Sequence, residues 1–319
     1  MDETDVLSSA LGALHISGSL VLHHVYRTPW AIQVPSSSEL ALLTGAPPDA
    51  RVVAFHFVER GELTLTTTGV PKKNVCAGEL VACFGGADHH LTRGQDAPIV
   101  PLAGILAGHA SPPHGDDRPE STRLLCGVFV LRDTSLNPLL AALPPVVHAS
   151  MTEDDLELFA RVLRRELRHA GNASSFIIDR VLEMLCAALV RDQITKTSED
   201  AVGLLRTLKD PRLSRALEQV HKAPAAPWTI DSLSKSAGLS RSRFSARFRQ
   251  LAGVAPMVYV TRWRMNVAAR MLRRTEHSVA EIAGFVGYES VPTFTRVFKR
   301  YLGDSPGRFR DVVRQGATS

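Results

Sequence analysis

Two stretches near the C-terminus carry hydrogen-bonding side chains at matching positions. They run over residues 240–256 and 290–306, and a serine, two phenylalanines, a glycine and a proline recur between them at an offset of 50. Repetition at a fixed spacing indicates duplicated structural units. Arginine, lysine, serine and threonine lie between the recurring residues, and their side chains can bond base edges or phosphate oxygens of DNA.

Each stretch has the pattern of a helix with a polar outer face. Ser240 and Ser290 suit the N-cap position, because a serine oxygen accepts a bond from a first-turn N–H. The phenylalanines are four residues apart and share one face, and the glycine and proline end the helix. We predict that the opposite face and the helix start bind DNA. The candidate contacts are Arg241, Ser242, Ser245, Ala246 and Arg249, then Pro292, Thr295, Arg296 and Lys299.

A short helical segment precedes each of these helices. The first begins near Thr229, and the second opens with the capping box from Ser278 to Glu281. Helix, glycine turn and capped second helix form the helix-turn-helix pattern. We therefore predict two such units, over 229–252 and 278–302, in an all-α DNA-binding domain spanning 211–319. The alternative is a solvated basic face on an ordinary helical domain, which would leave the repetition unexplained.

Charge is divided unevenly along the chain. Residues 211–319 contain 19 basic and 7 acidic side chains, whereas residues 1–210 contain 18 and 25. This asymmetry predicts a polyanionic partner for the C-terminal part, bound with a strong salt dependence. A membrane surface would also attract basic side chains, but here they lie on capped helices. We expect no membrane partner.

The 319 residues are enough for two domains, and no apolar run approaches the length of about 20 residues that spans a bilayer. The four cysteines form no C-x-x-C pair, which is typical of reduced thiols, and a redox-sensing pair is the alternative. The acidic N-terminus lacks the basic region of a secretory signal. We expect a cytoplasmic protein.

The N-terminal part alternates between apolar runs of strand length and turn-forming clusters, which predicts a sandwich or barrel. The runs lie at 20–26, 52–58, 62–67, 79–84 and 124–131. Helical periodicity begins after Thr152 and covers two stripes, at 156–167 and 178–189. Residues 192–203 are mostly polar and predict a linker.

The C-terminal part resembles the AraC/XylS family of bacterial transcription regulators. The resemblance covers about 105 residues and is strongest at 238–248, 279–290 and 294–300. It implies two helix-turn-helix units joined by a rigid helix, whose recognition helices enter two adjacent major grooves of double-stranded DNA. Ala246 and Pro292 depart from the usual family residues, which bears on the bases that are read.

Residues of about 5–135 resemble the cupin-type sensor domain that precedes this module in part of the family, notably at 55–61, 78–81 and 86–89. The helices at 153–191 resemble the family's dimerisation and linker segment. The implied fold is α+β: a cupin-like β-barrel over 1–150, a helical dimerisation and linker segment over 151–210, and the DNA-binding domain. We expect a homodimer; the alternative is that the helices at 153–191 only cover the barrel, and the sequence leaves this open.

Enzymatic cupins bind a metal through two close histidines, a glutamate and a later histidine. His56, Glu62 and His89 match three of these positions, whereas Val58 occupies the fourth. If the barrel binds a metal, these three residues are its expected ligands. We favour the alternative that there is no metal and no cofactor, and that His56 and His89 hydrogen-bond within the barrel or contact an effector.

These observations predict a sequence-specific transcription regulator, commonly an activator in this family, whose barrel senses a small molecule or another signal. We expect no enzyme activity, and RNA polymerase is a candidate partner. The alternatives are a metal-dependent cupin enzyme fused to a DNA-binding module, and a DNA-architectural protein without a sensor. The sequence leaves the effector, the promoter and the direction of regulation open.

Overall fold

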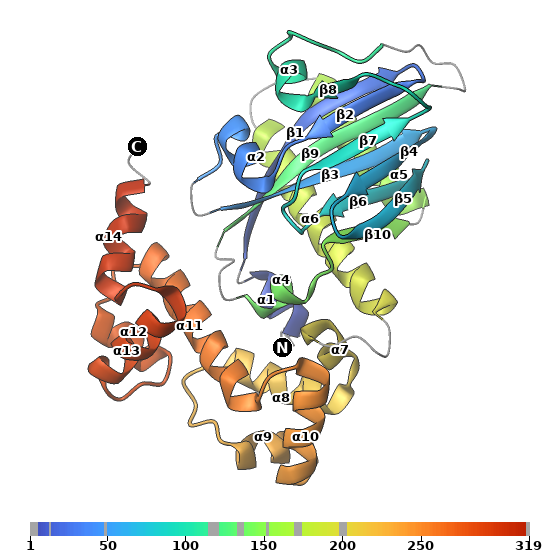
Figure 1. Cartoon of the computed structure of the whole chain (residues 1–319). Helices are drawn as coiled ribbons and strands as arrows, with labels where there is room; N and C mark the ends of the chain where they lie inside the picture. The colour runs from blue at the N-terminus through green and yellow to red at the C-terminus, as the bar shows by residue number, and fades with distance from the viewer. Residues whose placement is uncertain are drawn as a thin grey trace. The chain divides into compact units, whose positions relative to one another are not determined.

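The structure, a computed structural model, describes residues 6–12, 14–47, 50–113, 121–132, 137–150, 153–168, 174–197 and 203–316. The chain divides into two compact units (Figure 1). The barrel unit comprises residues 16–132 and 143–192, and the helical unit comprises 1–15, 133–142 and 193–319.

The barrel unit is built from two five-stranded sheets. In the first, the order is β1 (His15–Tyr26), β9 (Thr122–Arg132), β3 (Arg51–Arg60), β6 (Glu79–Cys83) and β10 (Val146–Ser150). In the second, it is β5 (Val70–Cys76), β4 (Glu62–Thr67), β7 (His89–Arg93), β2 (Trp30–Val34) and β8 (Ile99–Pro101). All five strands expected from apolar runs are confirmed.

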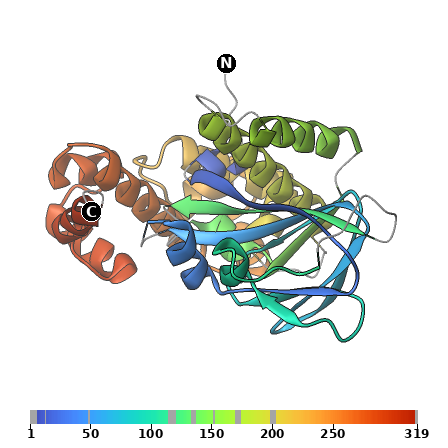
Figure 2. The same cartoon turned by 90° about the horizontal axis from the view of Figure 1, so that it is seen from above.

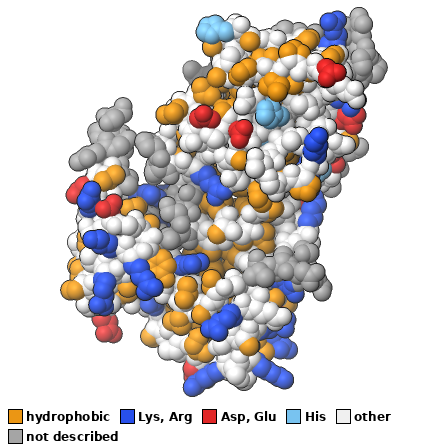
Figure 3. Space-filling model, viewed as in Figure 1, with side chains coloured by type: hydrophobic (Ala, Val, Ile, Leu, Met, Phe, Trp, Pro, Cys, Tyr) orange, Lys and Arg blue, Asp and Glu red, His pale blue; other side chains and the backbone are white. Residues whose placement is uncertain are grey.

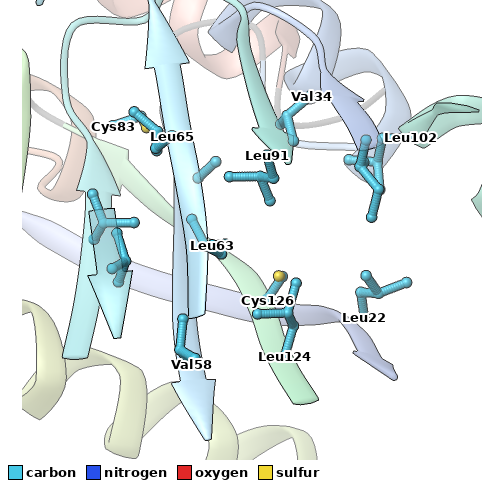
Figure 4. Close-up of a cluster of buried hydrophobic side chains, with 14 of the residues drawn as sticks. Leu22, Val34, Val58, Leu63, Leu65, Cys83, Leu91, Leu102, Leu124 and Cys126 are labelled. Atoms are coloured by element: carbon cyan, nitrogen blue, oxygen red, sulfur yellow. The ribbon is translucent and has the colours of Figure 1, made fainter. Parts of the chain in front are cut away.

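Side chains alternate between the two faces of the first sheet, and each face carries its own apolar layer. On β3, Val52, Ala54 and Val58 belong to the interior cluster between the sheets. Figure 4 shows part of this cluster, with side chains from several strands directed into a common interior. Phe55 and Phe57 lie on the opposite face of β3, because successive side chains of a strand point to opposite sides.

Two helices cover that opposite face, α5 (Glu153–Arg168) and α6 (Ser174–Lys196), as Figure 2 shows. Phe159, Leu163 and Leu185 from these helices line a small gap together with Phe55 and Phe57. Helix α6 continues to Lys196, so the prediction of a linker from residue 192 is wrong for its first part. Residues 198–202 lie outside the described part of the chain. Two shorter helices, α2 (Ser37–Thr44) and α3 (Leu102–Leu106), complete the described part of this unit.

The helical unit is centred on the long helix α11 (Pro256–Arg274), which contacts helices on both sides of it. Before it come α7 (Leu204–Lys209), α8 (Pro211–Lys222), α9 (Ile230–Ser236) and α10 (Arg241–Ala252). After it come α12 (Val279–Phe285), α13 (Val291–Leu302) and α14 (Pro306–Gly316). The expected α+β fold, with a β-rich N-terminal region, helices between and an all-helical C-terminal region, is confirmed.

Two helices from the N-terminal half of the sequence belong to the helical unit. Helix α1 (Val6–Gly12) packs on α8, and α4 (Pro138–Ala142) packs on α7. The buried side chain of Asn137 links them, since its Nδ2 donates a hydrogen bond to the Ala10 carbonyl at 2.9 Å. The N-terminal and C-terminal halves of the sequence therefore share one hydrophobic core here.

Candidate nucleic-acid interface

Helix α10 has the predicted cap, core face and outer face. The Ser240 side chain accepts a bond from the Arg243 backbone N–H, and Gly253 occupies the C-cap. Phe244 and Phe248 are buried, with ring centroids 5.7 Å apart. On the outer side, Ser242, Ala246 and Arg249 are exposed and Ser245 is half-buried.

Helix α13 repeats this arrangement. The Ser290 side chain accepts a bond from Thr293 N–H, and the rings of Phe294 and Phe298 are buried 5.6 Å apart. Pro292, Arg296 and Lys299 are exposed, whereas Thr295 is half-buried. The candidate contacts of both helices thus lie on the side away from the core. Figure 3 shows lysine and arginine side chains gathered over the helices of this unit on the visible face.

One candidate contact is held by a neighbouring helix. The Arg241 guanidinium pairs with the Asp231 carboxylate of α9, and its Nη2 lies 2.7 Å from Oδ1. Lys235 also reaches Asp231, at 3.1 Å. The hydrogen bond from Arg241, followed by that from Lys235, lowers the pKa of Asp231. Among the described residues, no ion pair involves Arg249, Arg296 or Lys299.

A stack of aromatic rings fixes the first helix-turn-helix against α11. The His221 ring lies 3.7 Å from the Trp263 ring in parallel, and its Nε2 is 2.8 Å from the Tyr259 hydroxyl. Tyr259 meets Phe248 of α10 edge to face. Burial lowers the pKa of His221 to about 3, so its ring is neutral at neutral pH. Sequence periodicity places Phe248 in the core but gives no signal for this histidine.

Arg264 of α11 ties the segment before α9 to the turn of the second helix-turn-helix. Its Nε and Nη2 donate to the carbonyls of Pro224 and Ala226 at 2.8 and 2.7 Å. Its guanidinium also lies 5.8 Å from the centroid of the Tyr288 ring. A bidentate arginine bonded to backbone carbonyls is a rigid link. Local sequence patterns give no signal for the positioning role of Arg264, because its partners are distant in the sequence.

The barrel histidines are brought together, but Glu62 is not. His56 Nε2 lies 2.8 Å from His89 Nε2 inside the barrel, and both residues are buried. Glu62 pairs instead with Arg93 at the partly exposed surface. The three residues named as ligands in case the barrel binds a metal, His56, Glu62 and His89, are therefore not brought together as a set. The inward positions of β4 belong to Leu63 and Leu65, so strand alternation directs Glu62 outward.

Comparison with known families matches both parts of this geometry. A model described as a cupin matches residues 5–195, and one described as a helix-turn-helix domain matches 233–311. A putative AraC-like transcription regulator of Streptomyces lividans is 31% identical, covering 96% of each chain. The chain belongs to the AraC family of transcription regulators. A second AraC-like relative, from Streptomyces antibioticus, is 34% identical and covers 96% of this chain and 97% of its own.

This AraC-family member is a DNA-binding transcription regulator with an N-terminal cupin domain and a C-terminal helix-turn-helix domain. The RCS-specific HTH-type transcriptional activator RclR of Escherichia coli K12 is 30% identical, over 61% of this chain and 70% of its own. The relatives are transcription regulators and not enzymes, which argues against the alternative of a cupin enzyme. Within the described residues, no helix is both long and apolar enough to cross a membrane.

Proposed function

We propose that this AraC-family regulator reads a specific DNA sequence with α10 and α13 in two adjacent major grooves. The observation that carries this proposal is the repeated helix whose phenylalanines are buried while Ser242, Arg249, Arg296 and Lys299 remain accessible. Helix α11 joins the two units and, with 19 residues, is about 28 Å long. Successive major grooves on one side of a duplex are about 34 Å apart, a comparable distance.

Gel-shift titration of the full chain against genomic fragments tests this proposal. We expect selected fragments to bind more tightly than unrelated DNA, with affinity that falls as salt rises. Binding without salt dependence, or equal binding to all fragments, would contradict it. We place this activity in the cytoplasm, where the chromosome lies.

We further propose the division into a sensor over 1–150, a dimerisation and linker segment over 151–210 and the DNA-binding domain over 211–319. The dimer proposal is supported by helix α6, which exposes apolar side chains on one side. Phe176 is 64% exposed and Met184 57% exposed, and Ile177 lies seven residues before Met184. Solvent-exposed apolar rows of this kind are typical of helix pairing.

Sedimentation of the full chain tests the dimer. We expect a homodimer that dissociates in the Met184→Glu variant, whereas Lys72→Glu on the barrel surface leaves it intact. A wild-type monomer at micromolar concentration would contradict the proposal.

The relative RclR is named an activator. We extend activation, through contact with RNA polymerase, to this chain as an expectation that a reporter assay checks.

The sensing role needs room for a ligand. The cavity inside the barrel measures about 20 Å³ and is lined by His56, Cys126 and apolar side chains. This volume holds about one water molecule, far less than a metabolite requires. An organic effector in this cavity therefore requires the barrel to expand, whereas a single ion does not.

The helical unit holds a larger hollow of about 250 Å³, lined by Ala142, Leu204, Tyr259 and Arg262 among others. Its apolar wall and one guanidinium suit a small apolar anion. We propose it as the second location for an organic effector. Ala142→Trp would fill it and would abolish the response to such an effector, whereas a filled barrel variant, Val34→Phe, would not. The opposite outcome assigns the effector to the barrel.

A further inference from the structure

The barrel interior contains a group of polar side chains that transcription regulation by α10 and α13 does not use. His56 on β3, Cys83 on β6 and His89 on β7 are all buried, with at most 6% of each residue exposed. One ring nitrogen of each histidine and the sulfur of Cys83 all lie within 4.8 Å of one another. Three strands from both sheets therefore direct donor atoms at one point in an otherwise apolar interior.

Polar groups in an apolar core cost stability unless they find partners. Burial, followed by the charge of the neighbouring His89, lowers the pKa of His56 well below its usual range. Burial lowers the pKa of His89 to about 4. The Nε2 atoms of the two rings face each other at 2.8 Å. Two nitrogen lone pairs at this distance repel unless a proton or a cation lies between them.

Cys126 completes the arrangement from the other side of the His56 ring. Its sulfur lies 3.1 Å from His56 Nδ1. When Nδ1 carries the ring proton and donates a hydrogen bond to this sulfur, Nε2 is left unprotonated and faces His89 Nε2. A hydrogen bond to the far ring nitrogen is the usual way in which proteins orient a metal-binding histidine.

We propose that His56, Cys83 and His89 bind one thiophilic metal ion, with Cys126 as a positioning residue. Metal–nitrogen bonds of about 2.0 Å and metal–sulfur bonds of about 2.3 Å place donor atoms roughly 3.3–3.6 Å apart. The observed separations, 2.8 Å between the nitrogens and no more than 4.8 Å overall, bracket this range. Small side-chain rotations then suffice to admit the ion.

Charge selects among the thiophilic ions. Two neutral imidazoles and one thiolate carry a charge of −1, so a monovalent ion gives a neutral site. A divalent ion would leave a positive charge among apolar side chains, which is costly. The site therefore fits copper(I) better than zinc(II), both of which accept imidazole and thiolate ligands. On binding, the Cys83 thiol releases its proton to solvent, and no electron is transferred.

A disulfide is a poor alternative use of these cysteines. Strand β3 lies between β6, which carries Cys83, and β9, which carries Cys126. Two strand spacings separate the backbones by about 9.6 Å. A disulfide requires Cα atoms closer than about 7 Å. The geometry therefore argues against a redox-sensing pair of Cys83 and Cys126.

Anaerobic titration of the metal-free full chain with copper(I), against a chromogenic chelator, tests the site. We expect one equivalent to bind, with affinity lowered about a hundredfold or more in Cys83→Ser and His89→Gln and about tenfold in Cys126→Ser. Cys76→Ser is the matched control, because Cys76 is exposed on the same barrel. X-ray absorption of the loaded wild type, which needs no variant to fold, should show two nitrogen donors and one sulfur donor.

Each outcome decides the proposal. Zinc(II) bound in place of copper(I), with the same dependence on Cys83, would keep the site and overturn its monovalent assignment. Absence of stoichiometric binding, or binding unchanged in Cys83→Ser, would overturn the site and leave a hydrogen-bonded trio. The idea that this metal is the signal sensed by the barrel rests on the proposed sensing role. DNA binding is therefore measured separately, with and without the ion. If the protein binds the metal but its affinity for DNA does not change, the metal site stands and its role as a signal is refuted. If the protein shows no specific DNA binding with or without the ion, the proposed function is refuted and the metal site stands.

Discussion

Gly287 and Ala225 are in such close contact that only a glycine fits at the first of these positions. A Cβ built on Gly287 would lie 2.6 Å from the Ala225 carbonyl oxygen, and the backbone has a φ of +79°. The turn of the second helix-turn-helix therefore rests directly on the segment that leads into the first. Arg264, bonded to Pro224 and Ala226 on either side, holds that segment in place.

We expect Gly287→Ala to destabilise the protein by at least about 2 kcal/mol, because it adds both a clash and a strained backbone. Gly284→Ala, in α12, is the matched control. A Cβ there has no neighbour within 4 Å, so this change should stabilise by about 0.5–1 kcal/mol through helix propensity. Urea unfolding of the two variants provides the measurement. Equal effects would show that the contact at Ala225 does not matter.

Arg296→Ala should weaken specific DNA binding by about 1–3 kcal/mol and relax the choice of base at one position. The reason is that Arg296 is exposed on α13 and, among described residues, enters no ion pair. Lys72→Ala, which removes one positive charge from the barrel unit, should leave both properties unchanged. Selection of binding sites from a random pool measures the base preference. An unchanged preference in Arg296→Ala would reject its role as a reader.

Asp231→Asn should strengthen non-specific DNA binding at low salt, because it releases Arg241, together with Lys235, for phosphates. One additional phosphate contact steepens the dependence of log affinity on log salt concentration by about 0.9. Glu218→Gln on α8 removes the same charge from the helical unit without releasing Arg241, and should change the slope less. If the two variants give equal slopes, Arg241 is not a latent DNA contact.

Acidification should destabilise the helical unit through His221. The folded-state pKa is about 3, below the ordinary value of 6.5, so the unfolded chain binds more protons between these values. The stabilisation is therefore complete above pH 6.5 and is lost as the pH falls toward 3. Between pH 7 and 5 the loss from this group is about 2 kcal/mol. His221→Phe keeps a ring against Trp263 but cannot titrate.

Calorimetric unfolding at pH 7 and pH 5 measures this difference for the wild type and the variant. His221→Phe should be less stable at pH 7, because the buried Tyr259 hydroxyl loses its partner, yet it should depend less on pH. An identical pH dependence in both proteins would assign the effect to other groups.

The recognition helices were predictable from the sequence because their determinants are local. Ser240, Phe244, Phe248 and Gly253 lie within four turns of one helix, and the repeat at Ser290 shows the same pattern. Strand-length apolar runs were also predictable. The ligand set in the barrel was not, because it depends on which face of β4 and β6 turns inward. Successive side chains of a strand point to opposite faces, so Glu62 on β4 points away from the barrel interior whereas Cys83 on β6 points into it.

The association of α1 and α4 with the helical unit was equally invisible to local patterns. Nothing in the spacing of Val6, Ala10 or Leu139 shows that they pack beside α7 and α8 and not on a sheet. Such contacts depend on three-dimensional placement, which a single sequence does not encode in any short window.

The packing of α1 on α8 matters for any attempt to prepare the DNA-binding domain as an isolated fragment. A fragment beginning near residue 203 would retain both helix-turn-helix units and yet expose to water the patch of α8 that normally receives Val6 and Ala10. Such a fragment should aggregate and fold poorly unless the seven residues of α1 are added as a peptide or fused to it.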